Sequence, residues 1–245
     1  MKIYFILIFL LMFGCNQSKK NEVKKTREKP SIIKDVKVEN EILYKDILVV
    51  LKNPENLVKI KHDLKSNNLS INQVVVDNKT YKAVIIKVPA DKTSFWIENL
   101  KKTNHFSSVE KNTKEALHKV NYFSKNRLVS VLKTPCFGDC PVFEVTFFKD
   151  GNVVFLGKEY TLVKGIYKFK LKEQQLKELS NLFEKTAFKD FENAKDSEEL
   201  QDYSNTFITY NDDKIKVKVW INISDEIAFA YDYIEGILID ENLIE

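Results

Sequence analysis

The stretch that decides the fold is residues 127–156, RLVSVLKTPCFGDCPVFEVTFFKDGNVVFL. It contains three short runs of β-branched and aromatic residues, at 128–132, 142–148 and 153–156, and such runs favour strands. The last two runs are separated by Lys-Asp-Gly-Asn, and an Asp-Gly pair is typical of the tight turn of a β-hairpin. The stretch therefore predicts antiparallel strands joined by short turns.

The remainder of residues 127–245 adds further strands and two amphipathic helices. Strands are expected at 165–171, 206–210 and 215–221, and in the last of them Lys218 should face solvent. Apolar residues at helical spacing predict the helices, with Leu176, Leu179, Leu182 and Phe183 in the first and Ile227, Tyr231, Ile234 and Leu238 in the second. Ser224 is the expected N-cap of the second helix. We expect an α+β domain built on an antiparallel sheet.

Residues 41–112 predict a second, smaller α+β domain. Its elements follow the order strand, helix, strand, strand, helix, strand: 47–51, a helix opening at Asn53-Pro54, 71–76, 81–88, a helix opening at Pro89-Ala90-Asp91, and 106–109. This βαββαβ order is the pattern of ferredoxin-like domains. Residues 113–126 are polar and are expected to form a connector, helical in part.

The N-terminus has the composition of a targeting segment. Lys2 precedes an apolar run over residues 3–13, which is too short to span a hydrocarbon core. The run ends in Leu11-Met12-Phe13-Gly14-Cys15, which resembles the lipobox of bacterial lipoproteins, although Met12 and Phe13 are bulkier than is usual there. The resemblance implies that residues 1–14 are a signal peptide and that Cys15 carries the lipid that anchors the chain; a plain secretory signal is the alternative.

A basic, polar segment follows Cys15. Residues 16–40 carry eight basic and four acidic residues and show no lasting periodicity, so we expect residues 15–40 to be a disordered tether. Residues 41–245 carry 30 basic and 31 acidic residues, so the excess positive charge belongs to the tether. Membrane lipid is therefore the expected partner of this segment, and no nucleic-acid partner is expected, because that would need a basic patch on a folded face.

Two further resemblances concern the folded domains. The string Pro135-Cys136-Phe137-Gly138-Asp139-Cys140-Pro141-Val142, with the strands and helix that follow it, resembles a family of uncharacterised bacterial envelope domains. That resemblance implies a location in the cell envelope and leaves the activity open. Through residues 83–89 and 106–112, the first domain, about seventy residues long, resembles the small prodomain and inhibitor modules of subtilisin-like proteases. That resemblance implies a ferredoxin-like fold reused for binding.

Cys136 and Cys140 are the two cysteines left once Cys15 is lipidated. Outside the cytoplasm we expect them to form a structural disulfide. A redox-active pair is the alternative, although the spacing is C-x3-C and thiol oxidoreductases use C-x-x-C. A metal site is disfavoured because the histidines His62, His105 and His118 lie in the other domain or the connector; we expect no cofactor.

The acidic residues suggest a binding surface. The candidates are Asp190, Glu192, Asp196, Glu198, Glu199 and Asp202. Residues 190–245 carry a net charge of −11 and residues 41–189 a net charge of +10, so a basic partner or a solvated acidic face is expected. No G-x-S-x-G, G-x-G-x-x-G or G-K-[ST] motif occurs, and we name no catalytic residue.

Together these patterns predict an envelope lipoprotein that faces the periplasm and acts as a non-catalytic binding or assembly module, with an envelope protein as partner. Two alternatives stay open. One is a thiol-redox protein that uses Cys136 and Cys140, and the other is inhibitor-like binding of a protease by the first domain.

Overall fold

The computed structural model describes residues 44–185, 191, 193, 200–220 and 223–245. The signal segment, Cys15 and the tether lie outside the described residues. Among the helices that are described, none is long and apolar enough to cross a membrane.

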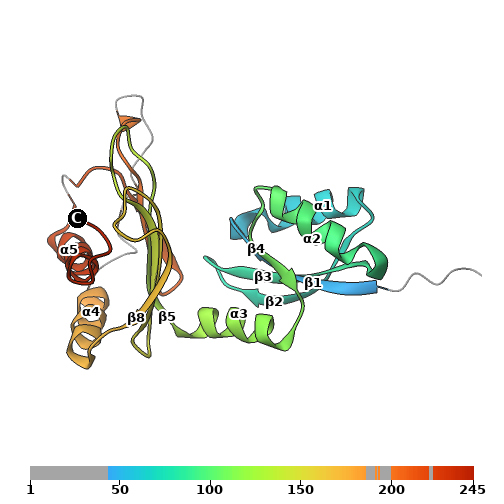
Figure 1. The fold of residues 1–245 in the computed structure, drawn as a ribbon, viewed down its shortest axis with the longest axis horizontal. Helices are drawn as coiled ribbons and strands as arrows, with labels where there is room; N and C mark the ends of the chain where they lie inside the picture. The colour runs from blue at the N-terminus through green and yellow to red at the C-terminus, as the bar shows by residue number, and fades with distance from the viewer. Residues whose placement is uncertain (1–43, 186–190, 192, 194–199, 221–222) are drawn as a thin grey trace, which may run out of the picture. The chain divides into compact units, whose positions relative to one another are not determined.

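The first domain is a four-stranded sheet with two helices on one face (Figure 1). Its strands are β1 (Tyr44–Leu51), β2 (Ser70–Asp77), β3 (Lys82–Pro89) and β4 (Phe106–Lys111). They pair antiparallel in the order β2-β3-β1-β4. The helices α1 (Leu57–Ser66) and α2 (Thr93–Lys102) connect β1 to β2 and β3 to β4. This confirms the ferredoxin-like βαββαβ domain expected from the sequence.

Local capping starts the first helical segment where the sequence indicated. Pro54–Asn56 forms a short 3-10 turn ahead of α1, and the Asn53 side chain accepts a hydrogen bond from the Glu55 backbone N–H at 3.0 Å. A similar turn, Ala90–Lys92, precedes α2. Both helices bury their apolar stripes, including Ile60, Leu64 and Leu100, against Ile47, Val49, Val84 and Ile86 of the sheet.

A third helix, α3 (Lys114–Asn126), covers the other face of this sheet. It begins at Thr113, whose side chain accepts from the Ala116 N–H at 3.1 Å. Ala116 and Val120 pack against Leu48, Val50, Val76, Ala83 and Ile85. The expected connector is thus a packed helix, and β3 is an apolar run because both of its faces are covered.

The second domain is a six-stranded antiparallel sheet. Its strands are β5 (Arg127–Lys133), β6 (Val142–Phe148), β7 (Asn152–Glu159), β8 (Gly165–Lys170), β9 (Thr206–Tyr210) and β10 (Asp213–Val217), in the spatial order β10-β9-β5-β6-β7-β8. The helices α4 (Glu173–Lys185) and α5 (Asp225–Asp240) pack on one face. The structure therefore confirms the α+β fold class in both domains.

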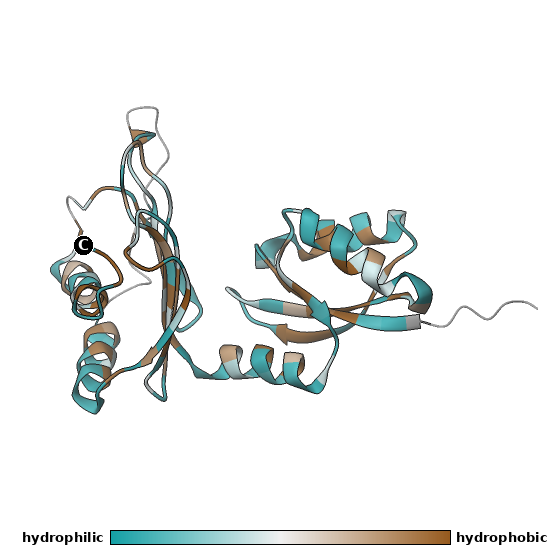
Figure 2. Cartoon of the chain, viewed as in Figure 1, coloured by the Kyte–Doolittle hydropathy of each residue, from teal (hydrophilic) through white to brown (hydrophobic). Residues whose placement is uncertain are grey.

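The core of this domain lies between the sheet and the two helices. Alternate strand residues point into it, so Phe143, Val145 and Phe147 of β6 are each no more than 1% exposed. The predicted helix stripes face them, with Leu179, Phe183, Ile234 and Leu238 fully buried. Hydrophobic residues accordingly concentrate on the strands and on the inner helix faces in Figure 2.

One strand is shorter than the sequence predicted. β10 ends at Val217, whereas alternation predicted a strand to residue 221. Its partner β9 begins at Thr206, which pairs with Val217, so the pairing of these two strands stops there. Lys218 is 8% exposed and does not face solvent as expected. The turn between these strands places Asn211 and Asp212 at φ 45° and 64°, a conformation that Asn and Asp tolerate.

Candidate functional site

The disulfide loop connects β5 to β6. Cys136 and Cys140 are joined by a disulfide, with their Cα atoms 5.8 Å apart. Gly138, between them, adopts φ +140°, and a Cβ built there would contact nothing within 4 Å. The backbone conformation, and not a lack of space, therefore favours glycine at this position.

Backbone hydrogen bonds hold this loop against a segment more than sixty residues away in the sequence. The Phe137 N–H donates to the Asp202 carbonyl at 2.9 Å. The Thr134 N–H donates to the Asn205 carbonyl at 2.9 Å, and the Asn205 N–H donates to the Thr134 Oγ1 at 2.8 Å. The loop is therefore fixed by three hydrogen bonds in addition to its covalent link.

The fixed loop presents an aromatic side chain to solvent. Phe137 is 87% exposed, the largest value among the exposed large hydrophobic residues of the described chain. Asp139, Asp202 and Tyr203 are also exposed, and Tyr203 follows the residue that holds the loop. We call Phe137, Asp139, Asp202 and Tyr203 the disulfide-loop surface. An apolar ring on a rigid support, beside two carboxylates, has the composition of a protein-binding anchor.

A partly buried polar network lies at the base of this loop. Lys133, the last residue of β5, forms an ion pair with Glu235 of α5, with 3.1 Å between Nζ and Oε1. The Tyr231 hydroxyl donates to the same Oε1 at 2.6 Å, and the Trp220 ring stacks on Tyr231 with centroids 4.3 Å apart. Burial, followed by the charge of Glu235, raises the pKa of Tyr231 above its ordinary value. Tyr231 is thus a hydrogen-bond donor that stays protonated, and the network joins α5 to the sheet.

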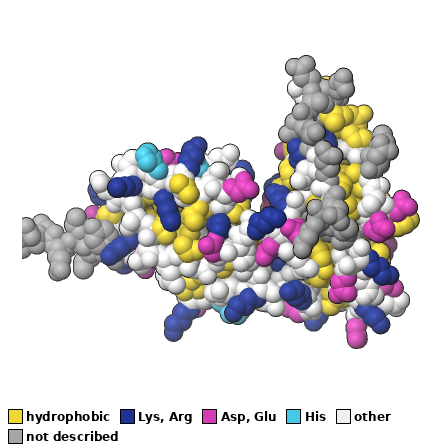
Figure 3. All heavy atoms as spheres, turned by 180° about the vertical axis from the view of Figure 1, so that it is seen from behind, with side chains coloured by type: hydrophobic (Ala, Val, Ile, Leu, Met, Phe, Trp, Pro, Cys, Tyr) yellow, Lys and Arg dark blue, Asp and Glu magenta, His cyan; other side chains and the backbone are white. Residues whose placement is uncertain are grey.

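One of the six acidic residues proposed as a binding surface is among the described residues. Asp202 lies in the disulfide-loop surface, as described above. The other five, Asp190, Glu192, Asp196, Glu198 and Glu199, lie outside the described residues. On the face shown in Figure 3, acidic and basic side chains are interspersed, with hydrophobic side chains between them.

Two of the three histidines of the first domain lie beside the same carboxylate, Asp63. His105 Nε2 lies 3.6 Å from an oxygen of Asp63, and His62 Nδ1 lies 3.7 Å from the other. His118, on α3, stacks on Tyr122 with centroids 6.4 Å apart. Within the described residues, no three His, Cys, Asp or Glu side chains gather in a way that could hold a metal ion.

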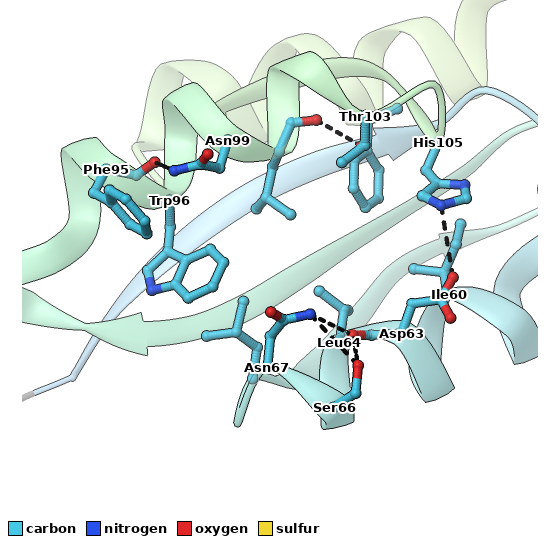
Figure 4. Close-up of a pocket in the computed structure, with 13 residues that line it drawn as sticks. Ile60, Asp63, Leu64, Ser66, Asn67, Phe95, Trp96, Asn99, Thr103 and His105 are labelled. Carbon is cyan, nitrogen blue, oxygen red and sulfur yellow. Dashed lines mark hydrogen bonds and ion pairs between the residues drawn. The ribbon is translucent and has the colours of Figure 1, made fainter.

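A cleft opens between α1 and α2 on the first domain (Figure 4). Its volume is about 590 Å³, within the range of small-molecule sites. Buried Ile60, Leu64 and Leu100 contribute apolar walls, and the Trp96 ring projects from α2 into the space between the helices. The Trp96 Nε1–H is buried, and it finds no acceptor in the part of the chain that the structure describes.

The rim of the cleft is polar. Asp63 and His105 face each other across its end, and Asn67 and Asn99 each donate to a backbone carbonyl of their own helix, at 2.9 and 2.8 Å. Sequence reasoning missed this cleft. Nothing in the local pattern indicates that α1 and α2 leave a gap beside Trp96.

Residues 127–238 match a protein family described as a domain of unknown function (DUF6438). The match contains the Cys136–Cys140 loop, both helices of the second domain for most of their length, and all six strands of its sheet. No curated protein and no solved structure shows a significant match to the chain.

Proposed function

We propose that this chain is a bacterial envelope lipoprotein that acts as a non-catalytic binding or assembly module. In this proposal residues 1–14 are removed, and lipid on Cys15 holds the chain to a membrane on its periplasmic side. Residues 15–40 are the tether. The C-terminal domain then binds a protein of the envelope through the disulfide-loop surface. The lipobox-like sequence and the basic composition of the tether support anchoring of the chain to a membrane.

The observation that carries the binding role is the exposure of Phe137 on a fixed loop. Removing a Phe side chain from water contributes about 1.5–3 kcal/mol, and this gain is available only to a bound partner when the side chain is exposed in the free protein. The disulfide and the hydrogen bond to Asp202 restrict the loop before binding, so little entropy remains to be lost. Asp139 and Asp202 favour a partner with basic residues around an apolar pocket.

The C-x3-C spacing and the backbone hydrogen bonds that hold the loop support a structural role for the disulfide over a redox role. A five-residue ring contributes about 2 kcal/mol in the chain-entropy treatment, a modest part of the stability of a domain. Its larger effect is to set the direction of Phe137. Reduction should therefore weaken partner binding without a catalytic consequence.

The test is affinity purification of the tagged, lipidated chain after crosslinking in cells, followed by mass spectrometry. The informative variant is Phe137→Ser, and the matched control is Phe229→Ser, because Phe229 is 63% exposed on α5 of the same domain. One dominant partner, lost with Phe137→Ser and kept with Phe229→Ser, is the expected result. Equal recovery with both variants would exclude the disulfide-loop surface as the binding site.

The cleft between α1 and α2 favours a second candidate function, which is the binding of a small apolar molecule. The Trp96 ring and the buried side chains of Ile60, Leu64 and Leu100 supply the apolar surface that such a molecule would cover. The probe is anilinonaphthalene sulfonate, which has an aromatic body and acceptor oxygens. Trp96→Phe should weaken its binding about fivefold, whereas Trp220→Phe should leave it unchanged. Equal affinities would exclude the cleft as the site.

A further inference from the structure

The outer edge of β8 is the second feature that a binding module could use. β8 is the last strand of the six-stranded sheet, and β7 is the one strand that pairs with it among the described residues. The peptide groups that point away from β7 are therefore available to another strand. Edges of this kind bind extended segments by adding them to the sheet.

The edge is held firmly in place. Gly157 of β7 pairs with Gly165 of β8, and the turn between them is closed by the Thr161 hydroxyl, which donates to the Val163 carbonyl at 2.9 Å. At the other end, the Leu171 N–H donates to the Gly151 carbonyl at 2.9 Å, and Phe169 packs against the core. An incoming strand would therefore meet an edge that is already ordered.

Exposed apolar side chains gather at this edge. Twelve large hydrophobic residues of the described chain are exposed, and four of them fall within residues 160–167. These four are Tyr160, Leu162, Ile166 and Tyr167, with exposures of 54, 54, 70 and 37%. Ile166 and Tyr167 lie on β8 itself, and Tyr160 and Leu162 lie in the turn that leads into it. Single exposed hydrophobic residues are common on protein surfaces, but such a concentration at the edge of a sheet favours an interaction site.

The charge of the edge is entirely positive. Residues 160–172 contain four lysines, Lys164, Lys168, Lys170 and Lys172, and no acidic residue, and all four are exposed. Lysines on an edge strand disfavour pairing with a second copy, because like charges would face each other across the new ladder. The same lysines favour a strand that carries carboxylates.

The register of the sheet specifies the pattern of that strand. Ile166 is opposite Leu156, Lys168 is opposite Val154, and Lys170 is opposite Asn152, so the three β8 residues lie on one face at alternate positions. A partner strand would place its own alternate residues beside them. It would therefore carry acidic residues beside Lys168 and Lys170. Tyr167, which is opposite Phe155, lies on the other face, so the partner's intervening residues would be apolar.

We propose that the outer edge of β8 binds an extended segment of a partner protein in which apolar and acidic residues alternate, and adds it to the sheet as a further strand. The proposal deepens the function proposed above and rests on it, since it names the chemistry of a partner at a second surface of the same domain. Backbone pairing supplies the affinity, while Lys168 and Lys170 on one face and Tyr167 on the other supply the preference for the segment.

The experiment measures fluorescence anisotropy of labelled peptides with the full chain in detergent. The probe is a peptide of about eight residues in which valine alternates with aspartate or glutamate. Two comparison peptides are used. The first has lysine in place of the acidic residues. The second is the acidic peptide with N-methylated amides at alternate positions, which removes the backbone donors that pairing with a strand needs. The acidic peptide should bind about tenfold more tightly than the lysine peptide, and the methylated peptide should not bind.

The matched variants are Lys168→Glu with Lys170→Glu, and Lys59→Glu with Lys61→Glu on α1, which make the same change of charge at exposed positions of the other domain. The first pair should weaken the acidic peptide about tenfold and the second should leave its affinity unchanged. The proposal would be overturned if both pairs of substitutions changed the affinity for the acidic peptide equally. It would also be overturned if the methylated peptide bound as tightly as the unmethylated acidic peptide. A dimer in sedimentation that dissociates on mutation of β8 would overturn it as well, because the occupant would then be a second copy. If the peptide experiment fails but capture of the partner still depends on Phe137, only the β8-edge proposal is wrong. If capture does not depend on Phe137 but the acidic peptide still binds, only the role of the disulfide-loop surface is wrong.

Discussion

Gly157→Ala and Gly236→Ala make the same chemical change and should shift stability in opposite directions. A Cβ at Gly157 would overlap the Val163 carbonyl oxygen and lie 2.6 Å from the Thr161 Oγ1. The carbonyl is a backbone atom that accepts the Thr161 hydroxyl, so neither neighbour can move without the loss of that bond. A Cβ at Gly236, within α5, would contact nothing within 4 Å.

The magnitudes follow from these contacts. Overpacking costs about 1–3 kcal/mol, and the broken hydrogen bond costs about 1 kcal/mol more, so Gly157→Ala should lower the free energy of unfolding by about 2–4 kcal/mol. Alanine is favoured over glycine inside a helix by about 1 kcal/mol, so Gly236→Ala should raise it by about that amount. Gly165→Ala is the intermediate control, because its φ of +87° imposes strain of about 1 kcal/mol with nothing to clash against.

The assay is equilibrium unfolding in urea. The chain contains two tryptophans, so a Trp96→Phe background leaves Trp220 as the reporter of the C-terminal domain. The expected order of midpoints is Gly236→Ala, parent, Gly165→Ala and Gly157→Ala, from highest to lowest. If Gly157→Ala unfolds at the same urea midpoint as Gly165→Ala, the β7–β8 turn is not closely packed around Gly157. The argument that the β8 edge is held in place would then also be wrong.

Three further predictions concern the cysteines and the buried tyrosine. Ellman's reagent should find no thiol at Cys136 or Cys140 in the purified chain until a reductant is added, and two reactive thiols in untreated protein would favour the redox alternative. Cys15→Ser should move the chain from the membrane pellet to the supernatant and abolish incorporation of radiolabelled palmitate; a variant that stays in the pellet would contradict the lipid anchor. The folded pKa of Tyr231 is raised, so the unfolded chain loses this proton first, and stability should fall as the pH rises above about 10. Tyr231→Phe should reduce that fall and cost about 1 kcal/mol at neutral pH, as measured by urea midpoints across the pH range; an unchanged alkaline slope would show that Tyr231 is not the group responsible.

Features that depend on a few adjacent residues were predictable from the sequence. Asn53 and Ser224 cap their helical segments as expected, since a cap is a bond between a side chain and a backbone N–H two or three residues away. The helix stripe of α5 is buried as expected, because helical spacing alone places its members on one face. The Asp-Gly hairpin between β6 and β7 has the same local origin.

Features that depend on distant segments were not predictable. β10 ends at Val217, opposite Thr206 where β9 begins, whereas the sequence of β10 alone continues to alternate past that point. The packing of α3 on the first sheet requires knowledge of which sheet face is uncovered. The candidate sites divide in the same way. The turn at Gly138 is local, but the hydrogen bond that holds Phe137 comes from the distant residue Asp202. The cleft beside Trp96 arises only where α1 and α2 meet.

The central claim is that the disulfide-loop surface contacts a partner in the envelope. The measurement that tests it most directly is photo-crosslinking in living cells, with a benzoyl-phenylalanine residue at position 137 and, as control, at position 58 on α1, where Val58 is 80% exposed. A discrete adduct with one envelope protein from position 137, absent from position 58, is the predicted result. No adduct from position 137, or the same adducts from both positions, would contradict the account.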